Sequence, residues 1–316
     1  MRRRQVILGG PVVLATLLAS RTSVAAGRAP IDQSVDRPFK RRISLIARDG
    51  PPFEVLLSTS SVYQGGALRV RTTIGTAGTA TLFGREYALA PANGALEGYL
   101  GIGVSDPPGP ARIGVRVENG SFVEEVILAA TVLRTDWTVD YITLPPPEPP
   151  DPNAPPPPPP PPEEEPLLPG IFAGRTPRKW SGRWLAPLPQ PLRVTGYFGE
   201  QRSFNGGPVQ GHHGGTDFGA DFGTPISSTN AGTIVMTGRY RTRGNLVVVD
   251  HGAGIMSLYG HMQEIAAALG EPVAAGAVIG YVGSTGLSTG AHLHWELSVS
   301  GVLVDGLRWL DGSQGF

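Results

Sequence analysis

The chain has 316 residues, enough for about two domains that each bury a core of their own, and its 26 basic and 26 acidic residues cancel. With no basic excess and no long run of like charges, the composition gives no indication of a nucleic-acid partner. Cysteine is absent, which excludes disulfides, thiolate metal sites, a cysteine nucleophile and a lipidated amino-terminal cysteine.

The amino-terminal segment has the pattern of an export signal. Three arginines follow Met1, residues 6–19 form an apolar stretch, and small residues at 23–26 offer a cleavage site. The stretch is shorter than the roughly 20 residues of a membrane-spanning helix. We therefore expect residues 1–26 to be a signal peptide, with an uncleaved anchor as the alternative. The mature chain should be exported to the periplasm, the cell envelope or the medium, by the general or the twin-arginine route.

Residues 43–143 alternate short apolar runs, rich in β-branched side chains, with glycine and proline. Asn119-Gly120 separates two such runs as a two-residue hairpin turn would. About seven strands at this spacing predict a β-sandwich of immunoglobulin-like kind over residues 27–144. Histidine is absent from this segment, so we expect a structural or binding module and not a catalytic one.

Residues 145–169 contain long proline runs followed by three glutamates. Proline supplies no backbone donors for a sheet or helix, so this segment should form an extended polyproline II spacer of roughly 3 Å per residue. The alternative is a ligand for a proline-recognising domain. We predict a semi-rigid linker that holds the two domains apart.

Residues 170–316 are glycine-rich and mostly strand-like, apart from a run at 261–270 that could hold a helical turn or two. They predict a compact, mainly antiparallel β domain with long loops. The whole chain is therefore predicted to be mainly β.

All six histidines lie between positions 212 and 294. His292 and His294 occur in a run whose alternation indicates a strand, so their imidazoles should project from one face roughly 7 Å apart. Leu293 and Trp295 should then point into a core. Two histidines placed in this way can hold a metal ion together with its reacting water, although a His-x-His pair alone does not establish a site.

His213 and Asp217 form the second element of a candidate site. They would lie roughly 13 Å apart on an extended chain, too far to share one ion comfortably. Gly214 and Gly215 disfavour a helix but permit a sharp bend that turns both side chains toward one point. Imidazole and carboxylate suit zinc, and three protein ligands with one open position are typical of catalytic zinc sites. The alternative is a glycine-rich turn whose polar side chains face solvent.

The remaining candidates carry weaker patterns. His261 follows an apolar strand and could lie beside the site or on the surface. His251 is interpreted as a structural turn residue, and His212 should face away from its neighbour. Glu296 continues the alternation of the His-x-His strand, so it could orient an imidazole or be an ordinary surface glutamate.

The order His-x-x-x-Asp, Tyr-x-His and Gly-x-His-x-His resembles that of the LytM/lysostaphin-type zinc metallopeptidases, which cut peptide bonds in bacterial cell walls. The similarity covers residues 180–310. It includes the scaffold residues Tyr197-Phe198-Gly199, Arg202, Gly223-Thr224-Pro225, Ala231-Gly232-Thr233, the run 244–252 and Val282-Gly283-Ser284-Thr285-Gly286. Ala291 departs from the proline usual before His-x-His, which should alter loop stiffness and not ligation.

The resemblance implies that His213, Asp217 and His294 bind one catalytic zinc ion. It also implies that His292 and His261 are the catalytic histidines, and either of them could accept the proton of the attacking water or stabilise the oxyanion.

The resemblance further implies a secreted zinc endopeptidase, active as a monomer, that hydrolyses peptidoglycan stem peptides or crosslinks. Two alternatives are open: a catalytically inactive peptidoglycan-binding regulator of other wall hydrolases, and a zinc peptidase that acts on glycine-rich proteins. The amino-terminal sandwich could bind wall glycans. The sequence does not identify the bond that is cleaved.

Overall fold

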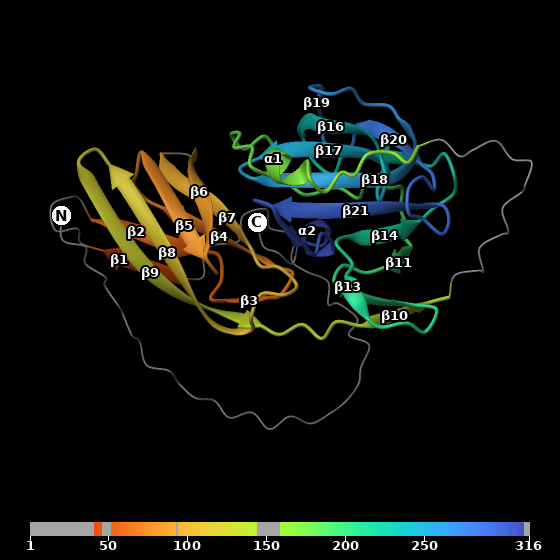
Figure 1. Ribbon diagram of the computed structural model, residues 1–316. Coiled ribbons are helices and arrows are strands. Elements are labelled where there is room, and N and C mark those ends of the chain that lie inside the picture. The colour runs from red at the N-terminus through yellow and green to blue at the C-terminus, as the bar shows by residue number, and fades with distance from the viewer. Residues whose placement is uncertain (1–40, 46–51, 93, 144–158, 313–316) are drawn as a thin grey trace, which may run out of the picture.

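The computed structural model describes residues 41–45, 52–92, 94–143 and 159–312. The expected signal peptide and the first part of the proline-rich segment lie outside these residues. Two β-rich domains lie side by side (Figure 1). Among the described residues, no helix is long and apolar enough to cross a membrane.

The described residues of the amino-terminal domain form nine strands. They are β1 (Arg41–Leu45), β2 (Phe53–Leu57), β3 (Ser61–Tyr63), β4 (Ala67–Thr72), β5 (Ala77–Leu82), β6 (Arg85–Ala92), β7 (Ala95–Gly101), β8 (Gly109–Asn119) and β9 (Phe122–Leu133). Their order is β1-β2-β4-β7-β6-β5-β8-β9-β3. β3 pairs parallel with β9, and the other pairs are antiparallel.

Strand β6 connects two sheets, because residues 85–89 pair with β5 and residues 90–92 pair with β7. Side chains alternate between buried and more exposed along these strands, and the buried ones form the core between the two sheets. In β8, for example, Ile113 and Val115 are buried while their neighbours are more exposed. The predicted hairpin is present, but its turn is Gly120-Ser121, since Asn119 pairs with Phe122.

The carboxy-terminal domain is built on an antiparallel sheet. Its main path runs β11 (Val194–Gly196), β14 (Thr216–Gly219), β21 (His292–Val299), β18 (Ile255–Ile265), β17 (Gly244–Gly252), β16 (Gly232–Tyr240) and β19 (Pro272–Val273). Further strands are β15 (Pro225–Ser227), β20 (Val278–Val282) and β22 (Val302–Val304), and a short helix, α2 (Leu307–Leu310), follows β22.

The core of this domain includes large aromatic side chains, among them Trp184 and Trp295. His251 is fully buried here, with its ring centroid 4.8 Å from that of Trp184. Its Nδ1 donates to the Ala231 carbonyl and its Nε2 accepts from Ser257 Oγ. Burial lowers the pKa of His251 to about 4, so the ring is neutral at physiological pH. Its role is structural, in the core and not in a surface turn.

The helical turn that residues 261–270 could hold is not formed. β18 continues as far as Ile265, because Met262 pairs with Asn245 of β17 on one side and with Val282 of β20 on the other. Pairing on both sides satisfies the backbone in the extended form, so a local preference for helix is overridden. The segment then turns at Gly270, whose φ is 83°.

The two domains share an apolar contact. Tyr99 of β7 belongs to the core of the carboxy-terminal domain, with its ring 5.8 Å from that of Trp180. The Gly65 carbonyl accepts a hydrogen bond of 2.8 Å from the backbone N–H of Asp305. The domains are therefore held against each other by buried side chains as well as by the chain that joins them.

A strand from the end of the amino-terminal domain also joins the other domain. β10 (Val139–Ile142) pairs parallel with β12 (Gln201–Phe204), which pairs antiparallel with β13 (Gln210–His212). Just before β10, the Trp137 ring lies edge-on to Phe198 at 5.9 Å. This small sheet places the connection beside the segment that leads to His213.

The prediction that residues 145–169 hold the domains apart is wrong. The domains pack together, and residues 162–168 contact the carboxy-terminal domain at the start of helix α1 (Leu168–Phe172). Leu168 is buried against β17 and β18, and α1 lies beside these strands (Figure 1). Composition predicts an extended backbone for such a segment, but it does not show whether the surfaces on either side are complementary.

Candidate metal centre

Three neighbouring strands bring the candidate ligands together. Asp217 of β14 lies opposite His294 of β21, and β18 runs along the other side of β21 with Gly260 opposite His294. His213 precedes β14. The side chains of His213, Asp217 and His294 are all buried, and their ligand atoms lie within 4.8 Å of one another.

The donor atoms form a nearly equilateral triangle. Asp217 Oδ1 is 2.7 Å from His294 Nδ1 and 3.1 Å from His213 Nε2, and the two nitrogens are 3.1 Å apart. A zinc ion held tetrahedrally at about 2.0–2.1 Å needs ligand atoms roughly 3.3 Å apart. The triangle therefore fits one small metal ion after a slight expansion.

The outer nitrogen of each ligand histidine is fixed by an acceptor. His213 Nδ1 lies 2.9 Å from the Tyr197 carbonyl oxygen, and His294 Nε2 lies 2.7 Å from a carboxylate oxygen of Glu296. Because both partners only accept, these ring nitrogens carry the hydrogens. His213 Nε2 and His294 Nδ1 are then the nitrogens that can bind a metal, which is how outer partners orient ligand imidazoles.

The electrostatics of the triad favour cation binding. Burial disfavours charge on His294, but hydrogen bonds to Asp217 and Glu296 outweigh it and raise the pKa of His294 to about 9. Burial likewise raises the pKa of Asp217, yet its contacts with His213 and His294 hold that pKa far below the ordinary value. Since a proton and a metal ion compete for the same nitrogen, acid should weaken metal binding.

Two further histidines face the triad. His261 Nδ1 donates to the Thr285 carbonyl at 2.7 Å, and His292 Nδ1 donates to the Gly290 carbonyl at 2.8 Å. In the neutral form of each ring Nε2 is then the acceptor nitrogen, and that of His292 lies 3.7 Å from Asp217 Oδ1. The ring centroids of His261 and His292 are 4.7 Å apart.

The environment of His261 suits a neutral ring. Burial and the neighbouring histidines lower the pKa of His261 to about 3, so the ring is neutral and can accept a hydrogen bond at neutral pH. Its φ is 61°, in the left-handed region that is sparsely populated outside glycine. A hydrogen bond of 2.7 Å from its backbone N–H to the Arg243 carbonyl holds that conformation.

The bend between His213 and Asp217 depends on one glycine more than on the other. A Cβ at Gly215 would lie 2.5 Å from the Trp295 carbonyl oxygen and 3.0 Å from His294 Cε1. A Cβ at Gly214 would approach nothing closer than 3.0 Å, and that atom is a terminal methyl of Leu303. The backbone of β14 can therefore lie this close to β21 only with glycine at position 215.

We expect Gly215→Ala to displace the His294 ring and to weaken zinc binding by roughly 10- to 100-fold, as loss of an orienting contact does. Overpacking should also lower the free energy of unfolding by about 1–3 kcal/mol. Competition with a chromophoric chelator and thermal unfolding of the metal-free protein would measure the two effects. Gly214→Ala is the matched control, and equal zinc affinity in the two variants would contradict this account of the bend.

His212 lies outside the cluster, as predicted. Its Nδ1 is 2.8 Å from the Gly199 carbonyl oxygen, and its ring lies 5.9 Å from that of Trp137. Glu296, which the sequence left open between two roles, is buried and contacts the outer nitrogen of His294.

The contacts that two arginines make behind the metal centre were not predicted from the sequence. Arg202 Nη2 lies 2.8 Å from Asp217 Oδ2, the carboxylate oxygen that faces away from the triad. Arg243 Nε lies 2.9 Å from Glu296 Oε1. The resemblance marks Arg202 only as part of the scaffold. No local pattern marks Arg243, because its partner is 53 positions away along the chain.

The structure thus combines a buried His-Asp-His triad that could hold a metal ion with two more histidines beside it on a β scaffold. Residues 211–306 match the model of peptidase family M23, and the carboxy-terminal domain of this chain belongs to that family, the LytM/lysostaphin-type metallopeptidases.

Characterised relatives match the same part of the chain. The peptidoglycan DD-endopeptidase ShyA of Vibrio cholerae is 36% identical over 122 residues, which are 39% of this chain and 28% of that protein. The DD-carboxypeptidase/endopeptidase Mpg of Neisseria meningitidis is 44% identical over 89 residues, 28% of this chain and 20% of that protein. The chain thus spans less than a third of the length of either relative.

One solved structure matches most of the chain. A protein of Pseudomonas aeruginosa assigned to peptidase M23 aligns with a TM-score of 0.54 and 25% identity, covering 80% of this chain and 95% of that one. This share is larger than the carboxy-terminal domain, so the likeness extends into the amino-terminal domain.

Proposed function

We propose that this protein is an exported zinc endopeptidase that cleaves peptide crosslinks of peptidoglycan. The observation that carries the proposal is the convergence of five side chains. Three donor atoms lie within 4.8 Å of one another, His292 Nε2 lies 3.7 Å from Asp217 Oδ1, and the His261 ring centroid lies 5.6 Å from that of His294. A metal site with a purely structural role needs no such additional groups.

Zinc is the metal that suits this donor set, which combines two imidazole nitrogens with one carboxylate oxygen. His213 Nε2, Asp217 Oδ1 and His294 Nδ1 would hold it. When bound, zinc supplies Lewis acidity at the scissile carbonyl. Glu296 and the Tyr197 carbonyl keep the two ligand imidazoles in the required tautomers.

His261 and His292 would carry out the proton transfers. Each donates its Nδ1 hydrogen to a backbone carbonyl, so each has an Nε2 that can accept a proton from the attacking water. Once protonated, the same atom can donate to the developing oxyanion or to the leaving amine. The carboxylate of Glu296 is held by His294 and Arg243, so the two histidines are the candidates for both tasks.

The relatives' names support peptidoglycan as the substrate. ShyA is a peptidoglycan DD-endopeptidase and Mpg is a DD-carboxypeptidase/endopeptidase. By this likeness, the bond cleaved here would join two D-centres in a crosslink. The arginines and apolar stretch at the amino terminus support export to the compartment that contains this substrate.

We also infer that the amino-terminal domain is immunoglobulin-like. Its order β2-β4-β7-β6 corresponds to the A-B-E-D sheet of such domains, and β5-β8-β9 corresponds to C-F-G. The parallel pairing of β3 with β9 fits an A strand that divides between the two sheets. The domain would be a rigid support for the small sheet β10-β12-β13 next to the metal centre.

Incubating the zinc-loaded full chain with purified peptidoglycan and, separately, with glycine-rich peptides tests this function. Mass spectrometry should show crosslinked muropeptide dimers converted to monomers, with the glycine-rich peptides intact. Cleavage of the peptides alone would indicate a protein-directed peptidase. Zinc binding with neither substrate cleaved would indicate an inactive regulator.

A further inference from the structure

The proline-rich segment ends on the back of the metal centre. Glu164 is completely buried, although it follows eight consecutive prolines in a stretch that composition alone predicts to be a solvated spacer. Among charged residues, full burial occurs almost only with specific partners. The contacts of Glu164 therefore show which part of the fold this end of the segment holds in place. We call residues 162–165 the strap.

The strap holds the turn between β16 and β17 through three consecutive backbone N–H groups. Arg241 N–H donates to the Pro162 carbonyl (3.0 Å), Thr242 N–H to Glu164 Oε2 (3.3 Å) and Arg243 N–H to Glu164 Oε1 (2.7 Å). Glu164 also begins the next element, since its carbonyl accepts from Leu168 N–H at the start of α1. The turn thus has a fixed position relative to the strap.

Arg243 passes this constraint to the metal ligand. Its guanidinium contacts Glu164 at 3.3 Å and Glu165 at 2.6 Å on the strap side. On the other side its Nε and Nη2 both lie 2.9 Å from Glu296 Oε1. That same oxygen accepts from His294 Nε2 at 2.7 Å. An unbroken series of charged contacts therefore joins the strap to a candidate zinc ligand.

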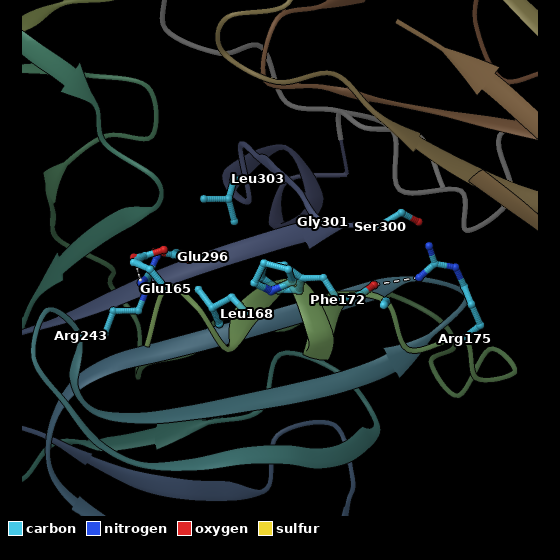
Figure 2. Close-up of a pocket in the computed structure, with 11 residues that line it drawn as sticks. Glu165, Leu168, Phe172, Arg175, Arg243, Glu296, Ser300, Gly301 and Leu303 are labelled. Carbon is cyan, nitrogen blue, oxygen red and sulfur yellow. Dashed lines mark hydrogen bonds and ion pairs between the residues drawn. The ribbon is translucent and has the colours of Figure 1, made fainter. Parts of the chain in front are cut away.

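The same arginine also supports the candidate catalytic pair. The Arg243 carbonyl accepts the backbone N–H of His261 at 2.7 Å, where His261 has its left-handed conformation. Figure 2 shows Glu165, Arg243 and Glu296 gathered at one end of a pocket of about 470 Å³ between α1 and strands β21 and β22. The pocket therefore borders one side of Arg243 and Glu296, and the strap covers the other side of Arg243.

We propose that the strap is part of the active-site support: Glu164 and Glu165 position Arg243, which orients the ligand His294 through Glu296. Glu164 is a positioning residue and touches neither metal nor substrate. Geometry held in this way matters because outer partners of ligand histidines change metal affinity by roughly 10- to 100-fold. The inference rests on the zinc site proposed above and assigns to that site a segment on the amino-terminal side of the matched family region.

The test is the zinc dissociation constant of the full chain, measured by competition with a chromophoric chelator. We expect Glu164→Gln, which keeps the shape of the side chain and removes its charge, to weaken zinc binding about 10-fold. Glu86→Gln is the control, because Glu86 is an exposed glutamate of β6, outside the strap and the turn that it holds, and its zinc affinity should equal that of the wild type. Thermal unfolding of the metal-free proteins separates a loss of affinity from a general loss of stability.

A double substitution tests the route. In a Glu296→Gln background, Glu164→Gln should have little further effect, because both act on His294 through Arg243. Additive losses, or wild-type zinc affinity in Glu164→Gln, would overturn the proposal. If Glu164→Gln does not fold, Glu165→Gln is the second test, since Glu165 is half-exposed and contacts the same guanidinium. This variant should weaken zinc binding a few-fold. Unchanged zinc affinity in Glu165→Gln would refute the proposed role of the strap. Absence of zinc binding in the wild type would instead refute the metal site itself.

Discussion

Replacing Asp217 by alanine is expected to abolish zinc binding and peptidoglycan hydrolysis together. Asp217 Oδ1 is the carboxylate donor of the triad, within 3.1 Å of both ligand nitrogens, so its loss leaves two imidazoles and no anionic ligand for the metal. It also leaves Arg202, whose Nη2 lies 2.8 Å from Asp217 Oδ2, next to an empty volume. Zinc affinity should fall by well over the roughly 100-fold that marks the loss of an outer partner.

Zinc content per chain and chelator competition would measure this loss, and dye release from labelled peptidoglycan would measure activity. Asp221→Ala is a suitable control, because Asp221 is an exposed acid four positions further along the chain, and it should leave both quantities unchanged. Wall hydrolysis by metal-free Asp217→Ala would contradict the assignment.

Replacing His292 by alanine is expected to separate the two properties. The Nε2 of His292 lies 3.7 Å from Asp217 Oδ1, beside the triad and not within it, so zinc should remain bound at close to wild-type affinity. Hydrolysis should fall by about 10²- to 10⁴-fold, the usual contribution of a positioned acid or base. The loss should appear in kcat, since the ring acts on the reacting groups.

His212→Ala provides a matched histidine control, because that ring packs on Trp137 outside the cluster. Zinc affinity and kcat of both variants should be determined on the same substrate. Loss of zinc from His292→Ala would make His292 a ligand, and unchanged kcat would leave His261 as the only candidate for proton transfer.

The candidate site could be predicted to a large extent because strand alternation determines which side chains share a face. His292, His294 and Glu296 project together from β21, and the glycines before β14 mark a bend that no extended or helical segment could replace. The pairing of β14 with β21 could not be predicted locally, since Asp217 and His294 are 77 positions apart. For that step the resemblance to a family was required.

Other features depended on contacts that the local sequence does not contain. Residues 261–265 become part of β18 because β17 and β20 are available to pair with them. Glu164 is in a segment whose composition predicts a solvated spacer, yet three N–H groups of a distant turn and the guanidinium of Arg243 accommodate this part of the chain. Complementarity between surfaces that are distant in sequence is a tertiary property, so composition gave the wrong prediction.

Titration of the metal-free full chain with zinc, followed by release of monomeric muropeptides, tests the central claim most directly. Activity should be absent without zinc, rise in proportion to added metal and level off at one equivalent per chain. Hydrolysis by the metal-free protein, or a chain that binds one zinc ion and never converts crosslinked dimers to monomers, would contradict the assignment of this site as a zinc-dependent peptidoglycan endopeptidase.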